Sequence, residues 1–101
     1  MNRLINKIYS LKDVFVPEWI MVRKELSPGE KLCYASLLTI ANQTTDVSRQ
    51  RIANFMGTSI RQVDRYIKRL RELKLIKVEK QGLQKPNQYY FYRHKWMNDE
   101  R

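Results

Sequence analysis

Three basic side chains recur on one face of the stretch that follows Ser59. Arg61, Arg65 and Lys68 share this face when the stretch is drawn as a helix with about 100° per residue. The opposite face carries an apolar stripe, made of Ile60, Val63, Ile67 and Leu70 with Tyr66 at its edge. Such a helix buries one side and offers cations on the other, and an arginine can bind a guanine edge through two hydrogen bonds. The spacing is therefore typical of binding to a polyanion.

The net charge of +10 is concentrated in one part of the chain. Thirteen Lys or Arg and three acidic residues lie between positions 49 and 95, so this stretch carries the whole excess of the 101 residues. A basic surface of this density favours a nucleic acid as partner. A general solubility charge and an anionic membrane surface are the alternatives, and we expect no membrane binding.

Groups for catalysis or metal binding are scarce. The chain has one cysteine, Cys33, and one histidine, His94, which cannot form a disulfide or a Cys/His zinc site. No carboxylate pair, nucleophile–base set or phosphate-binding glycine loop can be assembled from the scattered acids. We therefore predict no catalytic residue, no metal and no cofactor, and a protein that is not an enzyme. Cys33 is expected to be a small core residue, and His94 a packing or surface residue.

Length and composition fit one domain. A hydrophobic content of 43% in 101 residues is enough for a single modest core. No run approaches 18 apolar residues, and no small-residue cleavage site follows the apolar N-terminal residues. We expect a soluble, cytoplasmic protein.

Two N-cap residues and a glycine set the position of the basic face. Ser48 and Ser59 are N-cap residues, and Gln62 completes the capping-box pattern with Ser59. Helices are expected at about 49–56 and from Ser59 to about 73, with Gly57 in the left-handed conformation between them. The first of these helices is expected to bury three residues, namely Ile52, Ala53 and either Phe55 or Met56, and Val47 with Ile52 fits a hydrophobic staple.

The flanking elements are a preceding helix and a following hairpin. Ser27 and Glu30 form a capping box around Pro28, which predicts a helix to about Ala41. Its apolar stripe comprises Cys33, Tyr34, Leu37, Leu38 and Ala41. Residues 75–80 alternate apolar and charged side chains, 89–93 are aromatic and strand-prone, and the residues between are polar and basic. This pattern predicts a hairpin with a basic tip.

The first 24 residues form an apolar arm. Helical spacing of apolar residues predicts a short helix near the start, and Pro17 pushes Val16 toward extended geometry and ends it. The arm packs either on its own domain or on the same arm of a second copy, and its size favours a homodimer. The dimerisation candidates are Leu4, Ile5, Ile8, Phe15 and Trp19. Trp96 and Met97 are candidates to pack against the arm.

The order helix, helix-turn-helix, basic hairpin resembles the winged helix-turn-helix family. The resemblance covers about residues 25–93 and rests on the runs SRQRIANF from Ser48, GTSIRQV from Gly57, RYIKRL from Arg65 and LKLI from Leu73. It implies a mainly α fold with a small β-hairpin (α+β), in which three helices are followed by a two- or three-stranded wing. The arm at 1–24 precedes this domain and a tail at 94–101 follows it. Family members commonly have glycine where Lys74 stands, so Lys74 is expected to accept a strained backbone or to change the helix end.

A second likeness involves the start of the domain. Val16-Pro17-Glu18-Trp19-Ile20, Leu26-Ser27 and Glu30-Lys31-Leu32 are similar to the beginning of winged-helix domains in plasmid and phage replication initiators. They are also similar to what is expected of small accessory proteins that bind the transfer origin of conjugative plasmids. Full initiators are much longer, which favours a stand-alone accessory binder or regulator.

The resemblance assigns roles by position. If the helix from Ser59 enters the major groove, the candidates for base contact are Ser59, Arg61, Gln62 and Arg65. The phosphate candidates are Arg49, Gln50, Lys68 and Arg69. The wing candidates for the backbone or minor groove are Lys77, Lys80, Gln81, Gln84, Lys85, Asn87 and Gln88. The alternatives are a capping role for the Gln62 side chain, a merely solvated helix face and a merely exposed loop. Tyrosines and Phe91 are expected in the core or in strand pairing, which weighs against single-strand binding.

Three functions remain compatible with these residues. The first is a sequence-specific double-stranded-DNA-binding protein of a plasmid or other mobile element, acting at an origin of replication or conjugative transfer, with other replication or transfer proteins as further partners. The second is a winged-helix transcriptional repressor, which needs the same recognition of a site. The third is an interaction module whose basic face docks an acidic protein.

Overall fold

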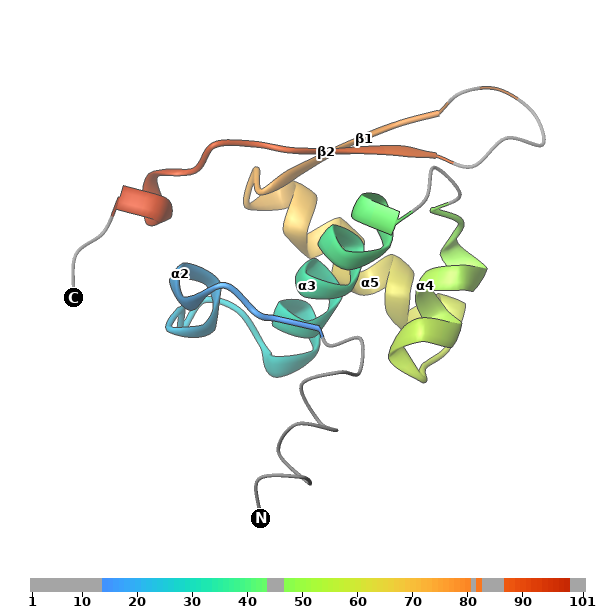
Figure 1. Ribbon diagram of the computed structural model, residues 1–101, viewed down its shortest axis with the longest axis horizontal. Coiled ribbons are helices and arrows are strands. Elements are labelled where there is room, and N and C mark those ends of the chain that lie inside the picture. The colour runs from blue at the N-terminus through green and yellow to red at the C-terminus, as the bar shows by residue number, and fades with distance from the viewer. Residues whose placement is uncertain (1–13, 44–46, 81, 83–86, 99–101) are drawn as a thin grey trace, which may run out of the picture.

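The structure is a computed structural model that describes residues 14–43, 47–80, 82 and 87–98 (Figure 1). Its elements in chain order are α2 (Glu18–Met21), α3 (Pro28–Gln43), α4 (Arg49–Met56), α5 (Ile60–Glu72), β1 (Ile76–Glu79), β2 (Gln88–Phe91) and a 3₁₀ helix η1 (Lys95–Asn98). The predicted helix before Pro17, with Leu4, Ile5 and Ile8, lies outside the described residues. None of the helices in the described part is long and apolar enough to cross a membrane.

Three helices and a hairpin enclose one core. α3, α4 and α5 pack on one another, and the hairpin lies along the top of the helices in the view of Figure 1. The largest fully buried side chains come from every layer, with Tyr34 and Leu37 from α3, Ile52 from α4, Leu70 from α5 and Ile76 from β1. The prediction of a mainly helical fold with a small hairpin is confirmed.

Side-chain caps fix where the helices begin. At α3 the Ser27 N–H donates to Glu30 Oε1 over 2.9 Å and the Glu30 N–H donates to Ser27 Oγ over 3.2 Å, which completes the predicted capping box. Ser48 Oγ accepts from the N–H of Arg51 at α4. Gly57 ends α4 with φ 72°, a conformation that costs glycine little. Helix α4 has the predicted bounds, and α3 runs two residues beyond Ala41.

The end of α5 is a complete Schellman motif built without glycine. Lys74 has φ 61°, its N–H donates to the Arg71 carbonyl over 2.9 Å, and the Leu75 N–H donates to the Leu70 carbonyl over 3.0 Å. Leu70 and Leu75 are both fully buried, which adds the apolar contact typical of this motif. Of the two predicted alternatives, a strained backbone at Lys74 or a different helix end, the structure shows the first.

The strands of the hairpin are shorter than the sequence pattern predicts. The antiparallel register pairs Ile76 with Phe91 and Glu79 with Gln88, and β1 and β2 are the two strands that the described residues contain. Leu75 and Tyr92 extend the ladder by one hydrogen bond, from the Tyr92 N–H to the Leu75 carbonyl over 3.1 Å. The hairpin therefore begins directly at the end of α5.

At α4, Ile52 and Ala53 are buried as predicted, and of the two alternatives for the third residue it is Met56 that packs against the core. Phe55 is 42% exposed, while Met56 is half-buried against the core. Phe55 points outward because Ile52 and Ala53 already occupy the buried side of this two-turn helix. Leu38 and Ala41 of α3 are also half-buried rather than buried.

The described part of the arm packs on its own domain. Pro17, with φ −56° and ψ 142°, is the N-cap of α2, a single turn that the sequence pattern did not indicate. Ile20 of α2 is fully buried. The Arg23 guanidinium lies 4.7 Å from the centre of the Trp96 ring and donates to the Trp96 carbonyl over 3.4 Å. The prediction that Trp96 packs against the arm is confirmed.

Candidate nucleic-acid interface

Helix α5 has one buried apolar face and one exposed cationic face. Val63, Ile67 and Leu70 are buried. Arg61, Arg65 and Lys68 are exposed on the other side, as their spacing predicts. Among the described residues, Arg61 and Lys68 have no salt bridge, so their charges face solvent. The helix can therefore present its cations to a ligand while its other face anchors it.

Two contacts set the position of α5. The Thr58 N–H donates to the Ala53 carbonyl over 2.9 Å, which ties the turn to α4. On α3, Gly29 lies directly beneath the Tyr66 ring, because a Cβ added at Gly29 would lie 2.3 Å from Tyr66 Oη. The missing Cβ thus allows the start of α3 to approach the flank of α5 closely.

The Gln62 side chain does not complete the predicted capping box. Ser59 Oγ accepts from the Gln62 N–H over 3.2 Å, which is the expected half of that motif. The Gln62 amide instead donates to Tyr66 Oη over 3.4 Å and accepts from Arg65 Nη1 over 3.1 Å. Side chains three and four apart on a helix are neighbours, so Arg65 and Tyr66 are both within reach of the Gln62 amide. Gln62 therefore links Tyr66 to Arg65 and orients the guanidinium.

The four phosphate candidates fall into different environments. Arg49 forms a 2.7 Å salt bridge with Asp64 of α5. Gln50 donates to Asn54 over 2.9 Å within α4. Lys68 is exposed on the cationic face, whereas Arg69 is half-buried and donates to the Glu25 carbonyl over 3.4 Å, on the side facing α3. Arg49, Gln50 and Lys68 thus share one side of the molecule, and Arg69 lies on another.

A groove connects the helix-turn-helix to the hairpin. It has a volume of about 680 Å³ and is lined by four cations, Arg49 of α4, Lys68 and Arg71 of α5, and Lys80 directly after β1. Asp64 is the acid in its lining, and it is paired with Arg49. Sequence reasoning did not single out Arg71, although its position three residues after Lys68 was a usable signal. The groove joins predicted helix and wing candidates on one surface.

The described wing candidates lie near this groove and on the outer hairpin face. Lys77 forms a 3.0 Å salt bridge with Glu79, and the hydrogen bond to Glu79 together with its charge raises the pKa of Lys77. Asn87 is half-buried beside Tyr89: burial raises the pKa of Tyr89, and the hydrogen bond with Asn87 acts in the opposite direction. Lys80 and Gln88 are exposed. Gln81, Gln84 and Lys85 lie outside the described residues.

Cys33 and His94 are used for packing. Burial, with a smaller effect of the Glu30 charge, raises the pKa of the Cys33 thiol to about 12. His94 Nε2 lies 3.1 Å from the Leu73 carbonyl, and Nδ1 accepts from the Trp96 N–H over 3.2 Å, so the ring carries its proton on Nε2. Its ring also stacks on Trp19 at 6.4 Å. In the described part of the chain, no group of three His, Cys, Asp or Glu is placed to hold a metal ion.

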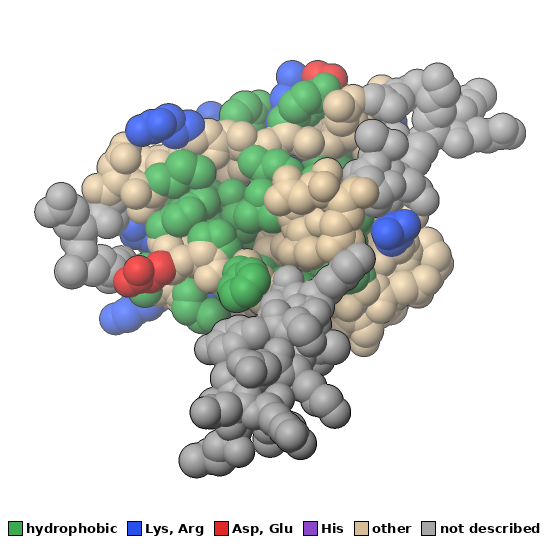
Figure 2. Space-filling model, in the orientation of Figure 1, with side chains coloured by type: hydrophobic (Ala, Val, Ile, Leu, Met, Phe, Trp, Pro, Cys, Tyr) green, Lys and Arg blue, Asp and Glu red, His purple; other side chains and the backbone are tan. Residues whose placement is uncertain are grey.

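The dimerisation candidates that the structure describes differ in exposure. Phe15 is 78% exposed. Trp19 is half-buried and meets the Tyr34 ring edge-on at 5.5 Å, so much of its surface is used within the chain. Figure 2 shows hydrophobic side chains gathered below the hairpin on the visible face, with Lys and Arg at the edges of that face.

Comparison with known proteins adds a family and a fold. No curated protein matches the chain. A solved structure described as the N-terminal domain of a DNA-binding protein is 20% identical, with a TM-score of 0.62 over 88% of this chain and 80% of that one. A second, described as a Rep–DNA complex, is 20% identical, with a TM-score of 0.63 over 88% and 81%. At this identity the likeness is one of fold. A family model described as a helix-turn-helix domain matches residues 24–76, and the chain belongs to this helix-turn-helix domain family.

Proposed function

We propose that this protein binds double-stranded DNA in a sequence-specific manner. The observation that carries the proposal is the division of α5, whose buried face fixes it to α3 and α4 while Arg61, Arg65 and Lys68 lie exposed on the other face. A helix of this kind fits the major groove, where guanidinium groups can read guanine.

The roles within the interface follow from the contacts. Arg61 and Arg65 would contact base edges, with Arg65 held by Gln62. Ser59, whose Oγ already accepts one N–H, keeps its hydroxyl proton for donation. Arg49, Gln50, Lys68, Arg71 and Lys80 would contact phosphates along the groove beside the hairpin. Arg69 would serve to connect α5 to the start of α3.

We infer further that the DNA site belongs to a plasmid or other mobile element, at an origin of replication or conjugative transfer. The sequence likeness to initiator and transfer-origin proteins supports this, and so does the fold similarity to a protein described in a Rep–DNA complex. In this proposal the protein is a cytoplasmic, non-enzymatic homodimer that works with other replication or transfer proteins. The exposure of the large apolar side chain of Phe15 supports the dimer.

Selection of bound duplexes from a random pool tests the proposal. We expect one enriched site, with Arg61→Ala changing the base preference and Lys80→Ala weakening all sequences alike. Equal retention of the enriched site and a scrambled duplex in a gel-shift series would contradict sequence-specific binding. A site that maps to a promoter would indicate the repressor alternative, whereas repeated origin sequences or a nick site would support the origin. Binding of an acidic protein without any binding of duplex would indicate the interaction module.

A further inference from the structure

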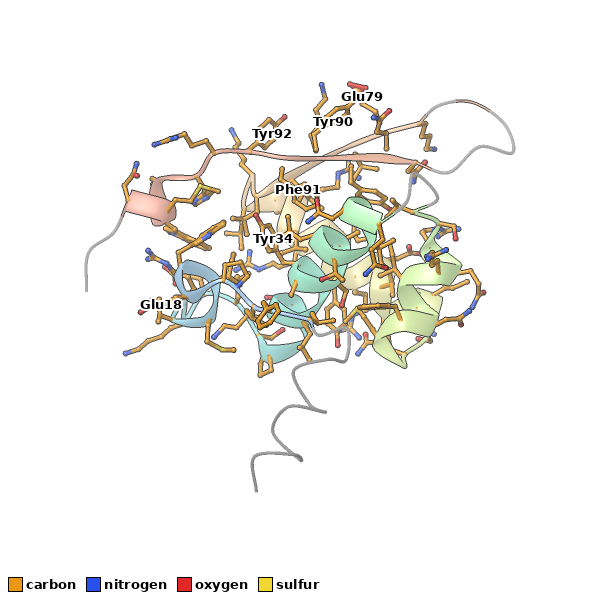
Figure 3. The ribbon with its side chains drawn as sticks, viewed as in Figure 1. Glu18, Tyr34, Glu79, Tyr90, Phe91 and Tyr92 are labelled. Carbon is orange, nitrogen blue, oxygen red and sulfur yellow. The ribbon has the colours of Figure 1, made fainter. Side chains whose placement is uncertain are left out.

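The outer face of the hairpin carries two tyrosines that the core does not use. Strand alternation sends Tyr89 and Phe91 inward, where Phe91 meets the Tyr34 ring edge-on at 5.7 Å. Tyr90 and Tyr92 lie on the opposite face and are 40% and 44% exposed. Figure 3 shows Tyr90, Tyr92 and Glu79 directed away from the helices, while Phe91 and Tyr34 lie beneath the hairpin. The prediction that the aromatic run belongs to the core or to strand pairing is confirmed, since the Tyr90 backbone pairs with Lys77, but the side chains of Tyr90 and Tyr92 lie outside the core.

A cationic groove borders this tyrosine pair. It has a volume of about 850 Å³ and lies where α5 ends and the hairpin begins, with Tyr92 in its wall. Its five cations are Arg71, Lys74, Lys77, Arg93 and Lys95, and its lining contains no acidic residue. Among the described residues, Lys77 forms a salt bridge with Glu79. The other four cations of the groove have no acidic partner in that part of the chain.

This surface is separate from the N-terminal half of α5. The 13 residues of α5 span about 20 Å, and the groove lies at the C-terminal end of that helix. Arg61 and Arg65 lie near the other end. A duplex read by the start of α5 therefore leaves the tyrosine pair available.

We propose that the tyrosine pair and the bordering groove bind single-stranded nucleic acid. The two rings are two residues apart on one face of a strand, so each can stack one of two neighbouring bases. The phosphates of the same strand then lie toward Lys74, Arg93 and Lys95. In the described part of the chain, these are the three unpaired cations of this groove that are not also in the lining of the duplex groove, which connects the helix-turn-helix to the hairpin. A duplex hides the faces of its bases within the stack, so this arrangement selects unpaired bases. An acidic protein would meet the cations but would gain little from two stacking rings.

Fluorescence anisotropy of the full chain with a labelled oligo-dT of about 15 nucleotides tests the proposal. We expect Tyr90→Ala and Tyr92→Ala each to weaken binding about ten-fold, since a stacked base contributes on that order, while Tyr90→Phe and Tyr92→Phe retain it. Lys74→Gln and Arg93→Gln are each expected to reduce the slope of log affinity against log salt by about 0.7. Lys24→Gln, on the exposed connection before α3, is the matched control and keeps the slope. The same measurement with labelled oligo-rU shows whether the site prefers DNA or RNA.

The outcomes separate this site from the duplex site. Arg61→Ala is expected to weaken duplex binding and to leave oligo-dT binding unchanged, whereas Tyr90→Ala does the reverse. Equal affinity of the alanine variants and the unmodified protein, no binding of either oligomer, or loss of both ligands on Arg61→Ala would overturn the proposal. Oligomer binding without duplex binding would overturn the proposed function alone. Thermal melting of each variant verifies folding, which these exposed positions should preserve.

Discussion

Replacing Gly29 with alanine perturbs the contact that sets α3 against α5. The added Cβ would lie 2.3 Å from Tyr66 Oη and 2.4 Å from Cζ, distances that require the rigid ring to move. Overpacking of this kind costs about 1–3 kcal/mol, while alanine in place of glycine inside a helix gains about 0.5–1 kcal/mol. The free energy of unfolding is therefore expected to fall by up to about 2.5 kcal/mol, which lowers Tm by about 4–8 °C for each kcal/mol.

The Tyr66→Ala background changes the sign of this effect. Without the ring the new Cβ has nothing to displace, so Gly29→Ala should then raise stability by about 0.5–1 kcal/mol through helix propensity alone. Urea denaturation of the four proteins of this double-mutant cycle measures the coupling energy, expected at about 1–3 kcal/mol. An equal effect of Gly29→Ala in both backgrounds would show that Tyr66 does not restrict the start of α3.

Three further predictions concern the helix end, the buried thiol and the groove. Lys74→Gly should stabilise the protein by about 0.5–1 kcal/mol because it relieves the positive φ, and Lys74→Ala, which keeps that φ, should give no gain in urea denaturation. Because burial raises the pKa of Cys33 from 9.0 to about 12, the contribution of this thiol to stability should be constant below pH 9. Above pH 9 it should fall by about 1.4 kcal/mol per pH unit, as only the unfolded thiol loses its proton, and Tyr34, whose pKa burial raises from 10.0 to about 12, adds to the loss above pH 10. Cys33→Ala should delay that alkaline loss, and an unchanged pH profile would contradict it. Asp64→Asn removes the acid of the duplex groove and frees Arg49 from its salt bridge. Duplex affinity should therefore rise at low salt, and the gain should shrink at high salt. A lower affinity would show that the salt bridge instead orients Arg49 for DNA.

Local signals predicted the helix-turn-helix accurately because the groups that fix it are close in sequence. The caps at Ser27, Ser48 and Ser59 each accept an N–H three residues away, and Gly57 needs no distant partner to adopt its φ. The stripe of α5 was also visible, since a period of 3.6 decides which side chains share a face. Positions and bounds of these elements were therefore within reach of sequence reasoning.

Contacts between residues that are far apart in the sequence could not be predicted from local patterns. Arg23 donates to the carbonyl of Trp96, 73 positions later, and the single turn of α2 is too short to show a period. The same limit applies inside the site. The Gln62 side chain can bond either to the N-cap N–H or to Arg65, and its bond with Tyr66 holds it toward Arg65. The Tyr66 ring can occupy its position because Gly29 of α3 has no Cβ. Sequence spacing could nominate Gln62 and Arg65 but not the contact between them.

The two ends of α5 are held by different contacts, by packing on α3 and α4 at one end and by backbone hydrogen bonds to the hairpin at the other. At the N-terminal end, the Thr58 N–H bonds to the Ala53 carbonyl of α4 and the Tyr66 ring packs against Gly29 of α3, so Arg61 and Arg65 move with the core. At the C-terminal end, the Leu75 N–H bonds back to Leu70 and the Leu75 carbonyl accepts from the Tyr92 N–H, so the hairpin starts from the helix cap itself. A hairpin anchored in this way keeps Tyr90 and Tyr92 at a fixed distance from the cationic face of α5. Any nucleic acid that contacts both surfaces must therefore adapt its own shape, because the backbone that joins them has little freedom to change.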